Sequence, residues 1–76
     1  MNEILFRFYD VKNNDTFEVS FDKRLSFKDN FKLLSNITLI NYDDIKIFEP
    51  NKNVFLDLEI MVAYYQFAYF ECLYLF

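Results

Sequence analysis

Two runs of alternating apolar and polar residues open the chain. The first covers residues 4–9 and the second covers residues 17–22. Alternation with a period of two is typical of strands that bury one face. Residues 10–15 between the runs are rich in Asn and Asp, which accept the positive φ angles that a tight turn needs. The pattern therefore predicts an antiparallel hairpin.

The period changes at Ser26. This residue is followed by Asp29, and a hydroxyl with an acid three positions later is typical of a helix N-terminus, where the hydroxyl accepts a hydrogen bond from a backbone N–H group. Apolar residues then recur at spacings of four, three and three, as they do on one face of a helix. This stripe consists of Phe27, Phe31, Leu34 and Ile37. We expect a helix of about three turns that packs on the hairpin.

The rest of the chain predicts three further strands, at residues 45–48, 54–56 and 70–76, and a turn at 49–53 that holds the only Pro. Asp57 can cap a short helical turn that ends near Val62. The order strand, strand, helix, strand, short strand, strand is that of a β-grasp, an α+β fold in which a mixed sheet of four or five strands packs on one helix. A ferredoxin-like order needs a second long helix, for which residues 57–62 are too few. We expect one domain, residues 1–76.

Composition narrows the class of function. The 76 residues carry a net charge of -4, with no Gly, no His and one Cys. Without His and Gly, an ordinary zinc site, Ser–His or Cys–His catalysis and a glycine-rich phosphate loop are excluded. The excess of acidic over basic residues argues against a nucleic-acid partner. We expect a binding module and not an enzyme, with no catalytic residue, cofactor or metal.

Targeting signals are not expected either. The first residues lack a basic segment followed by an apolar run, so they do not resemble a signal peptide. The most apolar stretch, residues 60–70, is too short to span a bilayer. We expect a cytoplasmic protein that does not insert into a membrane.

The strand residues divide between two faces of the sheet. By parity, the face toward the helix holds Ile4, Phe6, Phe8, Phe17, Val19, Phe21, Ile45, Ile47, Leu73 and Leu75. The outer face holds Leu5, Arg7, Tyr9, Lys46, Phe48, Cys72, Tyr74 and Phe76. Exposed Leu, Tyr, Phe and Arg side chains have the composition of an interface core. We therefore expect a protein partner, or a second copy of this chain in a homodimer, to bind at Leu5, Arg7, Tyr9, Lys46, Phe48, Tyr74 and Phe76.

The C-terminal stretch is similar to the end of a known family, whose members end in a pattern of the kind Leu-x-Asp-Tyr-x-Ile-x-Asp-Gly-Asp-x-Leu-x-Leu. The matching tyrosine, apolar residue, acid and two strand leucines are Tyr65, Phe67, Glu71, Leu73 and Leu75. With this stretch and its order of elements, the chain resembles the YukD/EsaB family, the ubiquitin-like proteins of bacterial type VII secretion. The resemblance implies an accessory or regulator of secretion that binds a component of the secretion machinery and is not conjugated. The family Gly is replaced by Phe70, and a C-terminal Gly-Gly is absent.

Other interpretations stay open. The chain is also compatible with a homo-oligomeric structural module or a small mobile-element inhibitor unrelated to secretion. A sulfur carrier is disfavoured because such carriers need a C-terminal Gly-Gly. The many aromatic residues also fit the codon bias of an AT-rich genome, and a register shift of one residue would exchange the two faces. A metal site at Asp43 and Asp44 and a nucleophilic Cys72 are disfavoured, because neither has a suitable neighbour in sequence.

Overall fold

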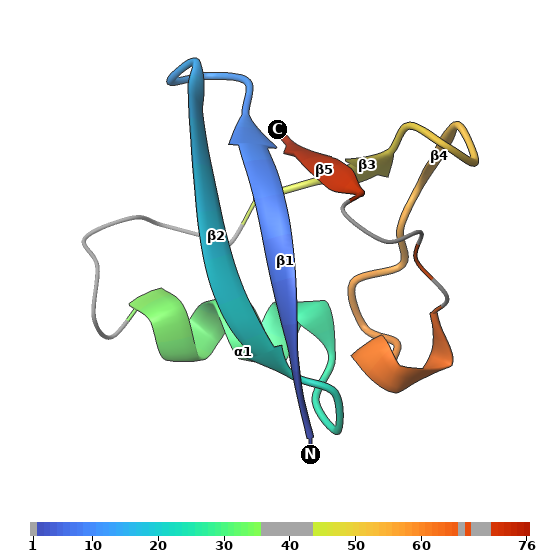
Figure 1. Cartoon of the computed structure of the whole chain (residues 1–76). Coiled ribbons are helices and arrows are strands. Elements are labelled where there is room, and N and C mark those ends of the chain that lie inside the picture. The colour runs from blue at the N-terminus through green and yellow to red at the C-terminus, as the bar shows by residue number, and fades with distance from the viewer. Residues whose placement is uncertain (1, 36–43, 66, 68–70) are drawn as a thin grey trace.

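Five strands, one α-helix and one short 3-10 helix make up the described part of the chain, residues 2–35, 44–65, 67 and 71–76, in a computed structural model (Figure 1). The strands form one mixed sheet in the order β2-β1-β5-β3-β4, in which only the β1–β5 pairing is parallel. This α+β arrangement of one sheet and one helix is compatible with a β-grasp. The elements are β1 (Glu3–Asp10), β2 (Asp15–Asp22), α1 (Phe27–Ser35), β3 (Ile47–Glu49), β4 (Val54–Phe55), η1 (Val62–Tyr64) and β5 (Cys72–Leu75).

The N-terminal hairpin confirms the prediction from alternation. Strands β1 and β2 pair without a bulge from Glu3 opposite Asp22 to Asp10 opposite Asp15. In the turn, Asn14 has a φ angle of 50°. Asn tolerates this left-handed conformation better than most residues, so it takes the place that Gly often has in such turns. The Asp10 carboxylate accepts hydrogen bonds from two backbone N–H groups of the turn and closes it.

Helix α1 begins at Phe27, as the sequence predicts. The Ser26 hydroxyl accepts a hydrogen bond of 3.0 Å from the backbone N–H of Asp29, so Ser26 caps the helix. The buried Asn30 joins the helix to β2, because its side-chain oxygen accepts from the N–H of Asp22 at 2.8 Å and its amide donates to the Asp22 carbonyl at 3.0 Å. Ile37, the last residue of the predicted stripe, lies outside the described residues.

The core is built from phenylalanine rings between the sheet and the helix. Phe21 lies at its centre, with ring centroids 5.5 Å from Phe6 and 5.0 Å from Phe31. Tilted and edge-to-face rings of this kind are favoured over flat sandwiches. The predicted parity is confirmed, because each residue expected on the inner face is buried or packs against the buried cluster. The buried apolar residues are Phe6, Phe8, Phe21, Phe27, Phe31, Ile47, Leu56, Val62, Leu73 and Leu75.

The C-terminal elements depart from the predicted boundaries. Strand β3 begins two residues later than expected and ends at Glu49, which the sequence places in the turn. Lys46 still pairs with Phe76 through two backbone hydrogen bonds of 3.0 and 2.8 Å, but it precedes the strand. In the turn that follows, Asn53 adopts a φ angle of 57°. The short helical turn is also displaced and covers Val62–Tyr64.

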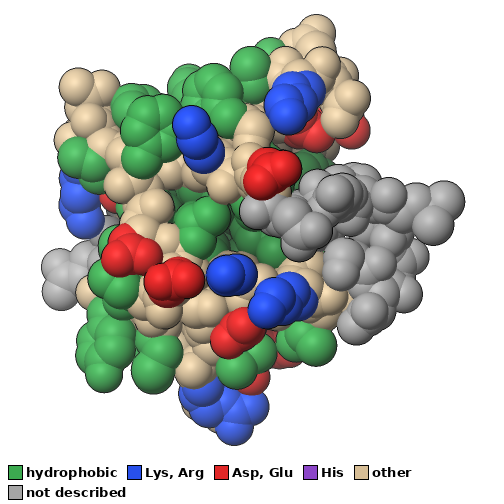
Figure 2. Space-filling model, turned by 180° about the vertical axis from the view of Figure 1, so that it is seen from behind, with side chains coloured by type: hydrophobic (Ala, Val, Ile, Leu, Met, Phe, Trp, Pro, Cys, Tyr) green, Lys and Arg blue, Asp and Glu red, His purple; other side chains and the backbone are tan. Residues whose placement is uncertain are grey.

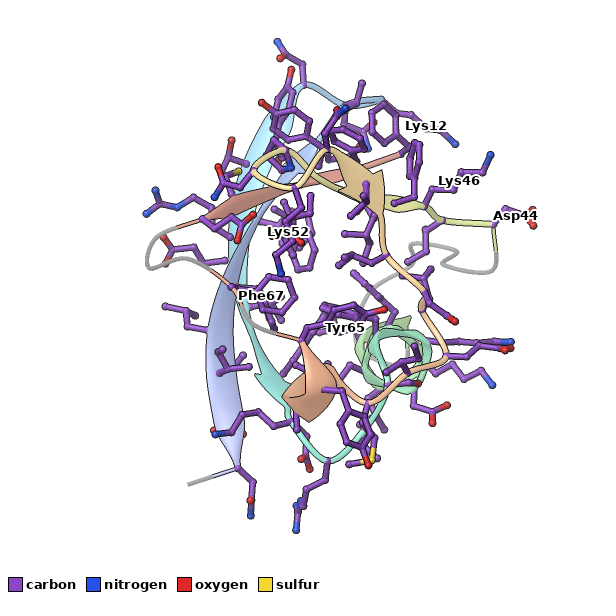
Figure 3. All side chains as sticks on the ribbon, turned by 90° about the vertical axis from the view of Figure 1, so that its right-hand side faces the viewer. Lys12, Asp44, Lys46, Lys52, Tyr65 and Phe67 are labelled. Carbon is purple, nitrogen blue, oxygen red and sulfur yellow. The ribbon has the colours of Figure 1, made fainter. Side chains whose placement is uncertain are left out.

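Tyr65 closes the segment between β4 and β5. Its hydroxyl donates to the Asp57 carbonyl at 2.8 Å and accepts from the Asp57 N–H at 2.9 Å. The ring lies against α1, with its centroid 5.9 Å from that of Phe27 (Figure 3). Burial raises the pKa of the Tyr65 phenol, which therefore stays protonated and able to donate. Its neighbour Tyr64 is 74% exposed.

Candidate functional site: an aromatic row on the outer sheet face

The outer face of the sheet carries a continuous row of aromatic side chains. In the strand register, Tyr9 stands opposite Tyr74, Tyr74 opposite Phe48, and Phe48 opposite Phe55. Residues directly opposite one another point to the same face, so four neighbouring strands each contribute one ring. Phe76, two residues after Tyr74, adds a fifth ring beside Phe55. We call these five residues the aromatic row.

The rings of the aromatic row touch in sequence across the sheet. The ring centroids of Tyr9 and Tyr74 are 5.8 Å apart, and those of Tyr74 and Phe48 are 6.3 Å apart. Phe55 lies 5.2 Å from Phe48 and 6.0 Å from Phe76. These spacings are those of favourable aromatic pairs, so each ring supports the orientation of the next. The row is therefore an ordered surface in the unbound protein.

This row faces away from the core. Phe55 is 60% exposed, Tyr74 and Phe76 are exposed to a lesser degree, and Tyr9 and Phe48 are half-buried. Helix α1 lies on the opposite side of the sheet, and no described helix covers the front of β1 and β2 (Figure 1). Seen from behind, the side of the molecule with α1 shows Lys, Arg, Asp and Glu side chains interspersed over its surface (Figure 2). The aromatic row is the larger departure from an ordinary solvated surface.

Charged groups border the row. Arg7 points to the outer face from β1 and forms an ion pair of 2.9 Å with Glu18 on β2. Both side chains are exposed, so this pair contributes little to stability, about 0–1 kcal/mol. Lys46 is exposed beside Phe76 at the other end of the sheet, where it and Lys12 project from the same part of the molecule (Figure 3).

Cys72 lies next to the row, opposite Arg7 in the strand register. It is half-buried, and burial raises the pKa of its thiol, although Arg7 acts in the opposite direction. A thiol with a raised pKa forms less thiolate, which is the nucleophilic species. Its environment therefore resembles that of a packing residue on the outer face.

Not all of the predicted binding residues come together. Tyr9, Phe48, Tyr74 and Phe76 join in the row, with Arg7 and Lys46 at its borders. Leu5 is exposed on the same face, but it stands four residues before Tyr9 on β1, roughly 13 Å along the strand. Leu5 is thus apart from the aromatic row.

Phe55 is the residue of the row that sequence reasoning missed. Strand β4 has only two residues, so no alternation is available to assign its faces. The residue that fixes the direction of Phe55 is its neighbour Leu56. Leu56 is buried, and successive strand residues point to opposite faces, so Phe55 points outward.

The described residues do not contain a group of three or more His, Cys, Asp or Glu side chains that could hold a metal ion. None of the helices within the described ranges has the length and apolar character required to cross a bilayer. Asp44 is exposed, and Asp43 lies outside the described residues. Comparison of the chain with protein-family models, curated proteins and solved structures finds no match.

Proposed function

We propose that this protein is a non-enzymatic interaction module that binds a protein partner through the aromatic row on the open face of a β-grasp sheet. The observation that carries this proposal is the row itself. Rings from four adjacent strands and from Phe76 form one ordered surface, while the opposite sheet face is filled by the core. A partner that covers this surface removes apolar area from water, and each Å² removed contributes about 25 cal/mol of favourable free energy before the costs of association.

Binding energy at such a surface is expected to concentrate in a few side chains. Aromatic residues near the centre of an interface are the usual sites of high energy, and polar residues at the rim set orientation and rate of association. Tyr74 and Phe48 hold the central positions of the row, and Phe55 is its most exposed ring. Arg7 and Lys46 take the rim positions.

The resemblance to the YukD/EsaB family supplies the class of partner in this proposal. The residues that carry the resemblance serve the fold, since Leu73 and Leu75 are buried and Tyr65 is bonded to Asp57. They support a β-grasp and do not by themselves define the binding surface. By resemblance, the protein is an accessory or regulator of type VII secretion, and its partner is a component of the secretion machinery.

The test compares single substitutions in the row with a matched control. Phe55→Ser and Tyr74→Ser remove exposed rings that the core does not use, whereas Tyr64→Ser removes an exposed ring from η1, outside the row. Thermal melting establishes that each variant is folded. Tagged parent and variants then capture type VII secretion components from cells that contain the machinery. We expect Tyr64→Ser to behave as the parent and the two row variants to lose at least 90% of the capture.

Sedimentation of the pure proteins over a range of concentrations accompanies the capture assay. Self-association of the parent that both row variants lose identifies the partner as a second copy of the chain. Folded row variants that keep every association of the parent contradict the proposal and leave the row as solvated surface.

A further inference from the structure

Glu49 is a buried carboxyl at the end of β3. Its side chain is 1% exposed and lies on the inner face of the sheet with Ile47. An isolated carboxylate in such a place is strongly destabilising, because it loses its hydration. Buried carboxyls therefore find cationic or hydrogen-bonding partners, or they retain a proton.

The cation nearest to Glu49 is a weak partner. Lys52 Nζ lies 3.9 Å from Glu49 Oε1, beyond ordinary hydrogen-bonding distance, and the lysine is exposed. Its side chain turns back from the β3–β4 turn (Figure 3). The other oxygen, Oε2, is buried and receives no hydrogen bond from any described residue.

Glu71 is the second group beside Glu49. It lies one residue before β5, and the pairing of Phe48 with Tyr74 makes it a diagonal neighbour of Glu49 across the two strands. Its Oε1 atom is buried as well. Two ionised carboxylates are both acceptors and cannot bond to each other. The two neighbouring carboxyls can therefore form a hydrogen bond only when one of them carries a proton.

Among the residues that the structure describes, the other elements around Glu49 offer no further charge. Its strand partner on β4 is Val54, and the inner residues of β5 are Leu73 and Leu75. The ionisable residues of α1, which are Lys28, Asp29 and Lys32, are exposed. Tyr65 is engaged with Asp57. Within the described part of the chain, the groups that act on Glu49 are thus Glu71 and Lys52.

We propose that the buried Glu49 carboxyl holds a proton beside Glu71, and that loss of this proton loosens the β3–β4 turn and disrupts the aromatic row. The second part deepens the proposed function and rests on it for its biological meaning. Glu49 directly follows Phe48, and its strand partner Val54 directly precedes Phe55. Two adjacent negative charges on the inner face of the sheet repel each other. This repulsion decreases when the β3–β4 turn moves toward solvent. That movement separates Phe48 and Phe55 from Tyr74.

The electrostatics agree with this geometry. Burial raises the pKa of Glu49 above its ordinary value of 4.5, Glu71 raises it further, and Lys52 opposes the change. The folded protein then binds more protons than the unfolded chain, so stability falls as pH rises from 4.5 through the folded pKa. The pKa of Asp22 is shifted in the opposite direction, because its hydrogen bonds with Arg24 lower it to about 2. The contribution of Asp22 to stability is lost only as pH falls below 3.8 toward 2. The pH ranges in which Asp22 and Glu49 affect stability are therefore separate.

The first experiment follows the carboxyl carbons of the parent protein by NMR during a pH titration, which needs no variant. We expect Glu49 to titrate above 4.5, and the backbone amides of Phe48 and Phe55 to shift with the same midpoint. Above that midpoint, the contacts between the Phe48 and Tyr74 rings should weaken by at least half. A Glu49 midpoint near 4.5 overturns the retained proton on Glu49. Amides and ring contacts that do not follow the Glu49 midpoint overturn the coupling to the row.

The second experiment measures urea unfolding against pH. Glu49→Gln keeps the shape of the protonated acid and supplies a donor, so we expect its stability to stay level where that of the parent falls. Glu59→Gln removes an exposed carboxyl and should follow the parent. A Glu49→Gln curve parallel to that of the parent overturns the proposal. Both experiments use pure protein without a partner, so their outcomes are independent of whether Phe55→Ser abolishes binding.

Discussion

At the scale of single residues, two polar side chains of this small domain add hydrogen bonds to the contacts made by the phenylalanine core. The Asn30 amide bridges α1 and β2, and the Tyr65 hydroxyl fastens the segment after β4 to Asp57. Each makes paired donor and acceptor contacts to the backbone. Asn30 is buried, and a buried polar group that loses its partner costs more than a hydrogen bond contributes, so this position is sensitive to substitution.

Tyr65→Phe tests the role of the Tyr65 hydroxyl. The substitution keeps the ring against Phe27 but leaves the Asp57 N–H and carbonyl without the hydroxyl. Because Asp57 is exposed, water can replace the hydroxyl, and we expect a loss of about 0.5–1.5 kcal/mol in the free energy of unfolding, measured by urea denaturation. Tyr64→Phe is the matched control, because that side chain is exposed, and it should change stability by less than about 0.5 kcal/mol. Equal effects of the two substitutions contradict the structural role of Tyr65.

At the scale of elements, α1 is held to the sheet by its aromatic stripe. Phe31→Ala removes a fully buried ring that contacts Phe8 and Phe21, with ring centroids 5.5 and 5.0 Å away. We expect a loss of about 3–5 kcal/mol, enough to unfold a domain of this size. Leu33→Ala, on the exposed side of the same helix, should melt close to the parent. A Phe31→Ala variant that melts within a degree or two of the parent would show that the helix register is wrong.

How well the sequence predicts an element depends on its length. The hairpin and α1 follow from long periodic runs and from the Ser26 cap, and the structure confirms them. The start of β3 and the outward direction of Phe55 were missed, because the strands have three and two residues and show no usable period. The burial of Glu49 was also missed, since a carboxylate beside Pro50 is typical of a turn and its partner Glu71 is distant in sequence.

At the scale of the whole molecule, β5 joins two halves of the sheet. It pairs with β1 on one side and with β3 on the other, and it contributes the buried Leu73 and Leu75 to the core. Deletion of residues 73–76 removes both pairings, so we expect the cooperative melting transition to disappear in circular dichroism. Phe76→Ser alters only the outer face and should retain the transition. A deletion product that still melts cooperatively would show that the hairpin and helix fold without β5.

The position of β5 also determines when a newly made chain can fold. Its parallel partner β1 leaves the ribosome well before residues 72–75, which lie far behind it in the chain. Until then, the hairpin and helix have no central strand to complete their sheet, and the phenylalanine face is incompletely covered. Non-local pairing of this kind is slow to form. Until β5 pairs with β1, this apolar face and the open edge of β1 are therefore sites at which the growing chain can aggregate.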